Sequence, residues 1–162
     1  MKTQFVAYYD SPVGWLKINS NGKAIKSITF VEQAHSTSSK LADILIECMK
    51  QLDAYFDGEL LQFKLELAPT GSEFQQKIWK LVSEIPYGET ASYLDIAIRS
   101  GSAKNTRAVG LANGKNPIPI IIPCHRIIGN KGKLTGYAGG LERKRWLLLH
   151  EQNHSTHSDR LF

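Results

Sequence analysis

The stretch Ile118-Pro-Ile-Ile-Ile-Pro-Cys-His-Arg-Ile127 is the part of this sequence around which the rest is arranged. Pro119 and Pro123 have a fixed φ, and each disfavours helical geometry in the residue before it. Three isoleucines between two prolines therefore predict a short, fully buried strand over residues 120–122. Cys124 would follow directly at the exit of that strand.

Cys124 has two interpretations at this point. His125 and Arg126 stand directly behind it, and cationic neighbours lower the pKa of a thiol toward the nucleophilic thiolate. Alternatively it is one more core cysteine, because free cysteine is among the most buried residue types. Consecutive residues of an extended segment point to opposite sides, so adjacency alone does not bring His125 to the sulfur. An acid–base partner would then come from elsewhere in the chain.

The composition is that of a soluble globular protein. With 162 residues and 42% hydrophobic content, the chain can bury one good core or two small ones that share an interface. It has no apolar run of about eighteen residues and no signal-peptide core at its start, so we expect a cytoplasmic protein without a membrane partner. Cys48 and Cys124 form no C-x-x-C pair, which argues against a structural zinc site and a disulfide framework.

The net charge of +5 is unevenly distributed. Residues 1–70 hold 7 Lys+Arg and 8 Asp+Glu, whereas residues 71–162 hold 13 basic and 7 acidic residues. A basic surplus of this kind fits a domain that binds a polyanion. A solvated basic face without any partner remains an equal alternative.

The first seventy residues predict a small mixed domain. Residues 6–30 alternate in β fashion around two tight turns, which indicates an antiparallel meander. Apolar residues at three-to-four spacing over residues 41–56 predict an amphipathic helix, and Cys48 falls on its apolar stripe as a core residue. Residues 63–67 alternate like one more strand.

Pro69-Thr-Gly71 is the predicted linker, which divides the chain into domains 1–70 and 71–151 and a polar tail 152–162. Ser72 and Gln75 resemble a capping box that opens a helix. Helices over residues 90–99 and 103–113, around the break at Ser100-Gly101, then have the outline of a helix-turn-helix. Generic helical hairpins share this pattern.

The third helix of this domain has an unusual surface. Its predicted core-facing residues are Ala108, Leu111 and Ala112. The opposite side carries Arg107, Gly110 and Gly114, which is nearly bare backbone with one long cation. Such a face suits the minor groove of DNA or tight packing against another helix, and the sequence leaves both open.

Two further segments frame Cys124. Asn116 lies in a turn before Pro117 and is a pivot whose side chain can bond to the neighbouring backbone. After a hairpin at residues 129–132 comes a Gly-rich loop, 134–140, with one aromatic residue, Tyr137. No Gly-Lys-Ser/Thr follows, which argues against a nucleotide-binding P-loop.

Residues 141–151 predict a last helix that is apolar nearly all round and buried. Glu151 would close it, where the helix dipole opposes a carboxylate, so this acid needs a partner, for which His125 is a candidate. We expect the remaining residues to be disordered. His154 and His157 reflect the composition of this tail rather than a metal site.

Three of these segments together resemble the O6-alkylguanine-DNA alkyltransferase family: Pro123-Cys-His-Arg126, Asn116-Pro-Ile-Pro119 and Gly136-Tyr-Ala-Gly-Gly140. Further motifs match in the same order and spacing, at residues 74–79, 85–90, 107–110 and 146–151. The resemblance is close over residues 72–151 and loose over residues 1–70. It implies an α/β (α+β) fold, with an RNase H-like mixed N-terminal domain and a C-terminal winged helix-turn-helix domain.

The resemblance also implies a function. Such a protein binds double-stranded DNA that contains alkylated guanine, as a monomer, and flips the damaged base out from the minor-groove side. It transfers the alkyl group of O6-alkylguanine, and by extension O4-alkylthymine, onto the residue matching Cys124. A thioether has no easy hydrolytic exit, so each molecule would react once. Neither a cofactor nor a metal is implied.

Individual roles follow from the same resemblance. His125, through a water held with Glu151, would draw the thiol proton, and Asn116 is the hinge of the family. Tyr93 would crowd the target phosphate and help to protonate the departing guanine. Arg107 would fill the hole that the extruded base leaves. Other implied DNA contacts are Lys104, Ala108, Gly110 and Arg126, and the implied pocket residues are Tyr137, Ala138 and Ile127.

The chain departs from the family pattern at one position of the pocket, and three other functions are alternatives to alkyl transfer. Some members carry Ser where this chain has Ala138, which removes a hydroxyl contact and leaves the preference among alkyl groups open. A non-reacting lesion sensor would have Trp at the position of Cys124. A helix-turn-helix regulator would read base sequence, typically as a dimer, and a thiol hydrolase would turn over repeatedly.

Overall fold

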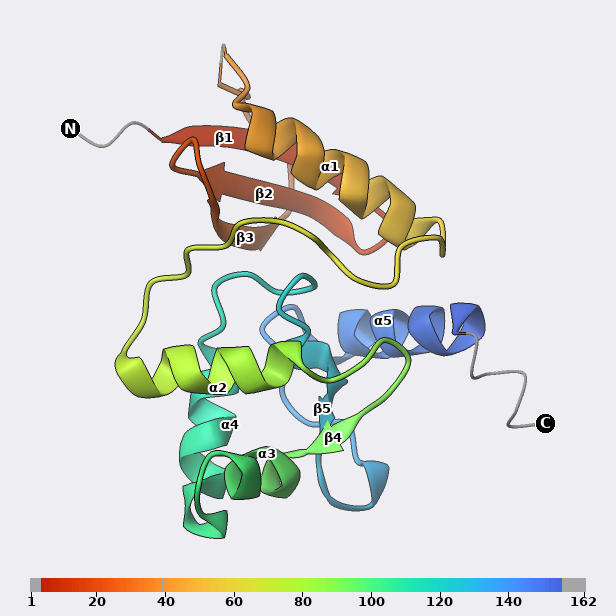
Figure 1. The fold of residues 1–162 in the computed structure, drawn as a ribbon. Coiled ribbons are helices and arrows are strands. Elements are labelled where there is room, and N and C mark those ends of the chain that lie inside the picture. Colours follow the sequence, from red (N-terminus) through yellow and green to blue (C-terminus); the bar gives the residue numbers. More distant parts are fainter. Residues whose placement is uncertain (1–3, 39, 156–162) are drawn as a thin grey trace. The chain divides into compact units, whose positions relative to one another are not determined.

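The computed structural model describes residues 4–38 and 40–155. By its internal packing the chain divides into two compact units, Met1–Thr70 and Gly71–Phe162 (Figure 1). The first combines strands with one helix and the second is mainly helical, so the expected mixed α/β architecture is confirmed. No helix in the described ranges combines the length and apolar character needed to cross a membrane.

The first unit is an antiparallel meander with one helix on its face. Its elements are β1 (Phe5–Ser11), β2 (Gly14–Ser20), β3 (Ile25–Val31) and α1 (Asp43–Phe56), with strand order β1-β2-β3. Leu16 and Ile18 of β2 are fully buried, as are Leu45 and Leu52 of α1. Cys48 lies on the same buried stripe of α1, as its spacing predicts, and burial raises the pKa of its thiol to about 12.

The strand predicted over residues 63–67 is wrong. The structure has only one isolated parallel bridge there, between Ile25 and Leu67. The side chain of Gln51 forms hydrogen bonds with both backbone groups of Lys64. Its Oε1 accepts from Lys64 N and its Nε2 donates to Lys64 O, each at 2.9 Å. Because a side chain satisfies this backbone, it does not need a strand ladder.

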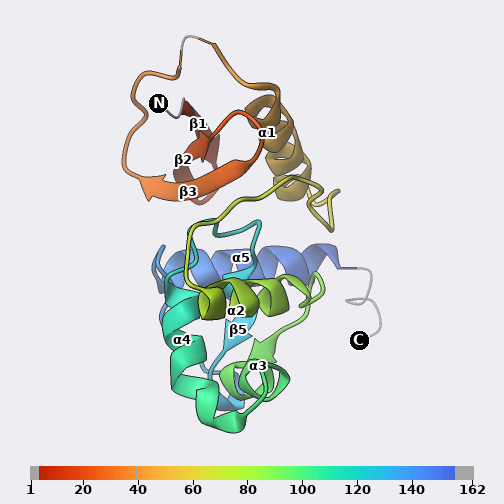
Figure 2. The same cartoon turned by 60° about the vertical axis from the view of Figure 1, so that its left-hand side comes forward.

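The second unit begins with a helix whose start was predicted correctly. Its elements are α2 (Glu73–Ser83), β4 (Ala91–Ser92), α3 (Tyr93–Arg99), α4 (Thr106–Gly114), β5 (Ile127–Ile128) and α5 (Leu141–His154). The Ser72–Gln75 capping box is present in both directions. Trp79 of α2 donates its indole N–H to Ala112 O of α4 at 2.8 Å, which fixes the two helices against each other (Figure 2).

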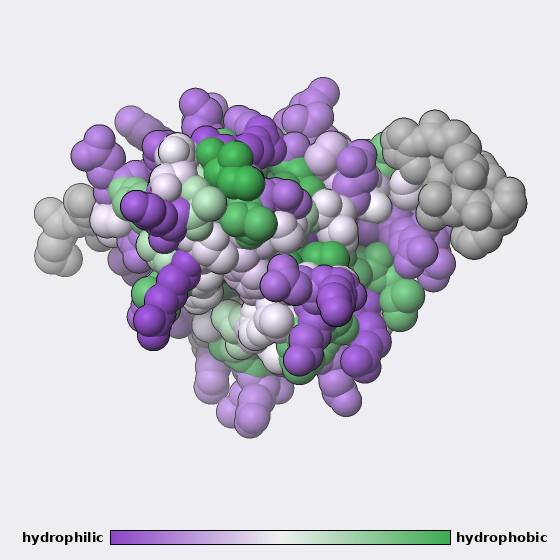
Figure 3. All heavy atoms as spheres, turned by 90° about the horizontal axis from the view of Figure 1, so that it is seen from below, coloured by the Kyte–Doolittle hydropathy of each residue, from purple (hydrophilic) through white to green (hydrophobic). Residues whose placement is uncertain are grey.

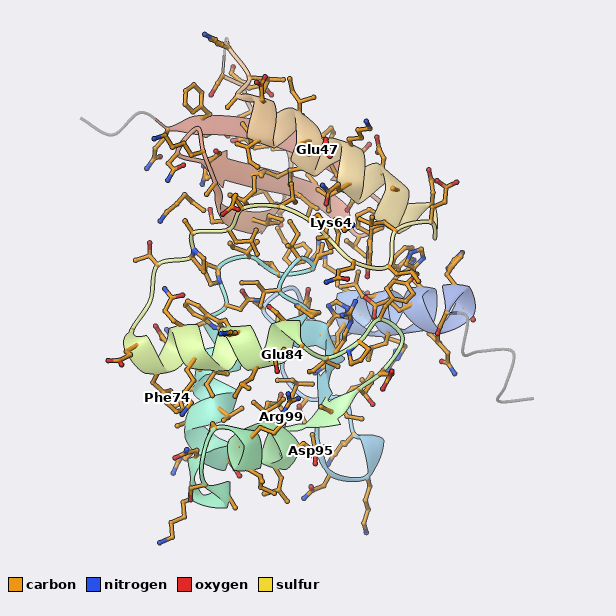
Figure 4. The ribbon with its side chains drawn as sticks, viewed as in Figure 1. Glu47, Lys64, Phe74, Glu84, Asp95 and Arg99 are labelled. Atoms are coloured by element: carbon orange, nitrogen blue, oxygen red, sulfur yellow. The ribbon has the colours of Figure 1, made fainter. Side chains whose placement is uncertain are left out.

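Helices α3 and α4 form the predicted helix pair, joined by the short 3-10 helix Ala103–Asn105. The first begins three residues later than predicted, because Ser92 caps it and the two residues before Tyr93 pair in parallel with β5. At the other end of α3, Arg99 forms an exposed ion pair with Glu84, the residue directly after α2, with 2.6 Å between Nη2 and Oε1 (Figure 4).

The orientation predicted for α4 is partly wrong. Its buried residues are Val109, Ala112 and Asn113, which follow the i, i+3, i+4 spacing of a core face. Ala108 is exposed, and Leu111 is 67% exposed instead of facing the core. The prediction placed two of three core positions one step out of phase, because it counted leucine as internal and did not consider a buried asparagine.

Residues 120–122 form turns instead of the predicted strand, and Ile120 has a φ of 75°. Ile122 N donates to Ile118 O at 2.9 Å, which closes a tight turn. The side chain of Asn116 bridges the two ends of this turn, accepting from Ile118 N at 2.9 Å and donating to Ile122 O at 2.8 Å. Asn116 thus acts as the local pivot, and it replaces the sheet partner that the prediction assumed.

Helix α5 is longer and less apolar than predicted. It continues to His154, so Glu151 lies inside its last turn and does not close it. Leu149 is 49% exposed, whereas Lys144 is fully buried. Residues 152–154 of the predicted tail are therefore helical, and His157 lies outside the described residues.

Candidate active site

Cys124 starts a 3-10 helix, Cys124–Arg126, directly after Pro123. The residue is 4% exposed. Its backbone is held on both sides, because Cys124 N donates to Ile122 O at 2.7 Å and Asn113 Nδ2 donates to Cys124 O at 3.3 Å. The sulfur is thus presented by a rigid turn inside the second unit.

The Cys124 thiol is protonated at neutral pH. Burial raises its pKa to about 11, although a hydrogen bond from the Asn116 side chain and the charge of Lys144 act in the opposite direction. The expectation that His125 and Arg126 lower this pKa is therefore wrong. A thiol in this state reacts as a nucleophile only when a base removes its proton.

A buried network behind Cys124 supplies a base. His125 is fully buried, and its Nε2 lies 2.7 Å from Oε2 of Glu151. Arg126 binds the same carboxylate with two nitrogens, Nε to Oε1 at 2.8 Å and Nη2 to Oε2 at 3.0 Å. Glu151 therefore has the partner expected for it, and a second one that the sequence did not suggest.

The charges in this network determine the tautomer of the His125 imidazole. Burial alone would raise the pKa of Glu151, but His125 and Arg126 outweigh it and hold that pKa well below its usual range. Burial lowers the pKa of His125, with Arg126 and Lys144 adding to the effect and Glu151 opposing it. A neutral imidazole must donate its Nε2–H to the ionised carboxylate, which leaves a lone pair on Nδ1. That Nδ1 is buried and has no hydrogen-bond partner among the described residues.

Arg126 was predicted to contact DNA, and the structure contradicts this. The residue is 7% exposed, and besides the carboxylate of Glu151 its Nη1 donates to Ile85 O at 2.7 Å. Its guanidinium also lies over the ring of Tyr87, 5.6 Å from the centroid. The 3-10 turn directs the Arg126 side chain into the interior. Its position next to Cys124 in the sequence does not reveal this orientation.

Lys144 is a site residue that the sequence analysis missed. It is fully buried, its Nζ donates to Thr135 O at 2.9 Å, and its charge acts on Cys124. Burial lowers its pKa and Cys124 raises it. The signal was available, because Lys144, Leu147 and Glu151 follow the three-to-four spacing of one helix face.

A cavity of about 710 Å³ opens between α3, α4 and the loop over residues 130–138. Its lining includes five predicted site residues: Tyr93, Arg107, Gly110, Tyr137 and Ala138. Cys124 and the fully buried Ile127 are not among the lining residues. Tyr137 lines the cavity and also interacts with the buried Cys124. Burial and the nearby Cys124 raise the pKa of the Tyr137 hydroxyl well above its usual value.

The surface of α4 beside this cavity is open. A Cβ built on Gly110 would meet only the ring of Tyr93, at 3.8 Å, and one on Gly114 would meet nothing within 4 Å. These glycines therefore do not serve helix packing, the alternative raised from the sequence. Lys104 and Arg107 are exposed cations on this part of the chain. The face of the molecule seen from below in Figure 3 carries hydrophobic residues interspersed with hydrophilic ones. In the described ranges no cluster of three His, Cys, Asp or Glu residues could hold a metal ion.

Two family models match this chain and together cover nearly all of it. Residues 5–69 match the ribonuclease-like domain of 6-O-methylguanine DNA methyltransferase, and residues 73–153 match the DNA-binding domain of the same family. The described site, including Cys124, the carboxylate network and the cavity, falls within the second match.

Individual relatives of this chain are methyltransferases of the same family. A methylated-DNA–protein-cysteine methyltransferase of Mycolicibacterium paratuberculosis is 46% identical over 157 residues, 94% of this chain and 95% of its own length. The crystal structure of Mycobacterium tuberculosis O6-methylguanine methyltransferase is 43% identical and covers 99% of both chains with a TM-score of 0.86. A structure of Mycobacterium tuberculosis OGT in complex with DNA is 48% identical, covers 91% of this chain and 92% of its own, and has a TM-score of 0.81. The chain therefore belongs to the 6-O-methylguanine DNA methyltransferase family of DNA-repair enzymes, the methylated-DNA–protein-cysteine methyltransferases.

Proposed function

We propose that this protein repairs duplex DNA by a stoichiometric, irreversible transfer of the alkyl group from O6-alkylguanine, and from O4-alkylthymine, to Cys124. The damaged base would be flipped out from the minor-groove side into the cavity at α4. The observation that carries the proposal is a buried cysteine beside a buried imidazole whose Nδ1 has no partner among the described residues.

The base in this proposal is Nδ1 of His125. A water molecule would bridge Nδ1 and the sulfur, so that the thiol proton passes to the imidazole as the sulfur attacks the alkyl carbon. Glu151 accepts the Nε2–H bond and would stabilise the imidazolium that forms, in the manner of a Ser-His-Asp triad. Asn116 would hold the sulfur, toward which its side chain already donates.

The alkyl transfer leaves electrons on the base. As the S–C bond forms, the C–O6 bond breaks and its electron pair passes to guanine, which takes up one proton. The Tyr93 hydroxyl on the cavity wall is the proposed donor, and it lies 2.8 Å from Oγ1 of Thr135. The product is a thioether that water does not hydrolyse. Each molecule should therefore act once, without a cofactor.

The flipped base would stack on Tyr137, and the backbone at Cys124, Ile127 and Ala138 would bond its edge. Because Cys124 is 4% exposed and does not line the cavity, the loop that carries Tyr137 must shift as the base enters. Arg107, on the cavity wall, would fill the gap left in the duplex.

Binding to DNA would use the open face of α4. The exposed Lys104 supplies charge for phosphate, and Ala108 and Gly110 allow close approach to the backbone. We also propose that the protein acts as a monomer in the cytoplasm, because the cavity and the nucleophile belong to one unit of one chain and the substrate is genomic DNA.

The decisive experiment uses duplex DNA with radiolabelled O6-methylguanine. We expect at most one equivalent of label per protein, located on Cys124, and none in Cys124→Ser. Cys48→Ala is the matched control, since this second cysteine lies in the core of the other unit, and it should accept the full equivalent. Repeated turnover, or full transfer to the Cys124→Ser protein, would refute the proposal.

A second measurement isolates base flipping. Arg107→Ala should slow repair of duplex DNA much more than it slows the reaction with free O6-benzylguanine, which needs no extrusion. Equal slowing of both reactions would remove Arg107 from this role.

A further inference from the structure

Asn113 is a buried side chain of α4 to which the roles above give no function. It is 5% exposed, and its Nδ2 donates to Cys124 O at 3.3 Å. Its other amide atom, Oδ1, is buried and has no hydrogen-bond partner among the described residues. A buried acceptor without a donor destabilises a fold, and native proteins rarely keep one unless something outside the chain satisfies it. The amide of Asn113 therefore calls for a donor that the chain itself does not supply.

This amide lies where the flipped base would bond to the protein. Cys124 O is among the backbone groups proposed for the base edge, but this oxygen already accepts from Ile127 N and from Asn113 Nδ2. A carbonyl oxygen has two lone pairs, so both are in use. Because Oδ1 and Nδ2 of Asn113 share one carbon, the unused acceptor lies beside Cys124 O. A donor of the base that approaches this point meets Oδ1 of Asn113.

The amide is also held in one orientation by a rigid element. Asn113 is three residues after Gly110 and directly before Gly114, two residues of α4 that line the cavity. The indole of Trp79 fixes α4 through its bond to the neighbouring residue 112. A flipped amide would place Oδ1 against the oxygen of Cys124, so the bond to that carbonyl settles which amide atom is the donor. The acceptor is thus positioned before any base arrives.

The chemistry of the lesion identifies the donor. Alkylation at O6 leaves N1 of guanine without a proton, so N1 becomes an acceptor and the 2-amino group is the only donor on this edge of the base. O4-Alkylthymine has no N–H donor on the corresponding edge, and a purine without the 2-amino group has none either. A site built to bond a particular N–H group rejects analogues that lack it, because its own polar atom is then left unpaired.

We infer that Asn113 is a specificity-determining residue, whose Oδ1 accepts a hydrogen bond from the 2-amino group of the flipped O6-alkylguanine. This inference deepens the proposed function and rests on it. The base supplies the donor that the buried Oδ1 lacks, while Cys124 O keeps both of its bonds. A base without the amino group leaves Oδ1 unpaired, so its transition state is bound less tightly.

The test compares two free purines that differ only in this group: O6-benzylguanine and 6-benzyloxypurine, which lacks the 2-amino group. The measured quantity is the ratio of their rates of benzyl transfer to Cys124. Asn113→Leu keeps the approximate size of the side chain and removes both amide atoms. We expect the wild type to prefer O6-benzylguanine and the ratio to fall about fivefold in Asn113→Leu, the effect of one neutral hydrogen bond.

The chain offers a matched control. Oδ1 of Asn19 is also buried without a partner among the described residues, but Asn19 belongs to β2 of the other unit. Asn19→Leu should keep the wild-type ratio, and a fall as large as in Asn113→Leu would overturn the inference. Asn113→Met, measured in the same way, guards against a poor fit of leucine, and thermal unfolding shows whether each variant is folded.

The outcomes separate this inference from the proposed function. Equal slowing with both purines would identify Asn113 as a merely structural residue, because its bond to Cys124 O does not depend on the 2-amino group. A wild-type ratio in a folded Asn113 variant refutes the inference and leaves the proposed function intact. The wild type alone is a further test, since equal rates with the two purines overturn the inference without any variant. No transfer from either purine refutes the proposed function, and the inference with it.

Discussion

Replacing Arg126 by methionine tests how the site keeps a carboxylate ionised in its interior. Glu151 is 1% exposed and shares its two oxygens with His125 and Arg126. Removing one partner of a buried ion pair leaves an uncompensated charge and typically destabilises a protein by about 3–5 kcal/mol. Ile85 O loses its Arg126 donor as well. We therefore expect the free energy of unfolding at pH 7, from urea denaturation, to fall by at least about 3 kcal/mol.

The stability difference between the wild type and Arg126→Met should depend on pH in a defined direction. In the wild type the pKa of Glu151 is held low, so its stabilising contribution is present above the ordinary glutamate pKa and is lost only as the pH falls through the lowered value. Without Arg126, the pKa of Glu151 should rise above its wild-type value, because burial is then opposed by His125 alone. The variant then takes up a proton in mildly acidic solution, and the stability difference between wild type and variant should shrink from pH 7 to pH 5.

The chain contains a matched control for this measurement. Arg99 pairs with Glu84 at 2.6 Å, but the two side chains are 49% and 46% exposed (Figure 4). Arg99→Met should therefore change the free energy of unfolding by less than about 1 kcal/mol. Adding Glu151→Gln to Arg126→Met should recover part of the loss, because the unpaired carboxylate charge is then removed. Equal effects of the two arginine variants, or no recovery in the double variant, would refute the reasoning.

Two further predictions concern single helices. Gly110→Ala should stabilise α4 by up to about 1 kcal/mol, because a Cβ there makes only an ordinary 3.8 Å contact with Tyr93. The same variant should repair duplex DNA more slowly but should keep its rate with free O6-benzylguanine. Unchanged repair of duplex DNA would exclude a close approach of this face to DNA. Ser72→Ala removes the hydroxyl that accepts from Gln75 N at 3.1 Å and should lower the stability of the protein by about 0.5–2 kcal/mol in thermal unfolding. A variant as stable as the wild type would mean that the capping box does not hold α2.

Features that depend on neighbours in the chain were predictable from the sequence. The capping box at Ser72 and the apolar stripe through Cys48 follow from side-chain chemistry within one or two helical turns, and both are present. The meander of β1 to β3 and the pairing of α3 with α4 follow from local periodicity and turn residues in the same way. Local competition was harder to foresee, as Asn116 shows, since its side chain replaced a strand ladder with a turn.

The family motifs in the sequence predicted that Cys124, His125 and Glu151 belong to one site, and the tertiary structure alone decided their charge states. Arg126 and Glu151 are 25 residues apart, and only folding makes the arginine an internal ligand of that carboxylate instead of a contact for DNA. The same folding buries Cys124 so deeply that its pKa rises to about 11, and it brings Lys144 from another helix to oppose that rise. A pKa reflects desolvation and all nearby charges, and both depend on which distant segments pack around the group.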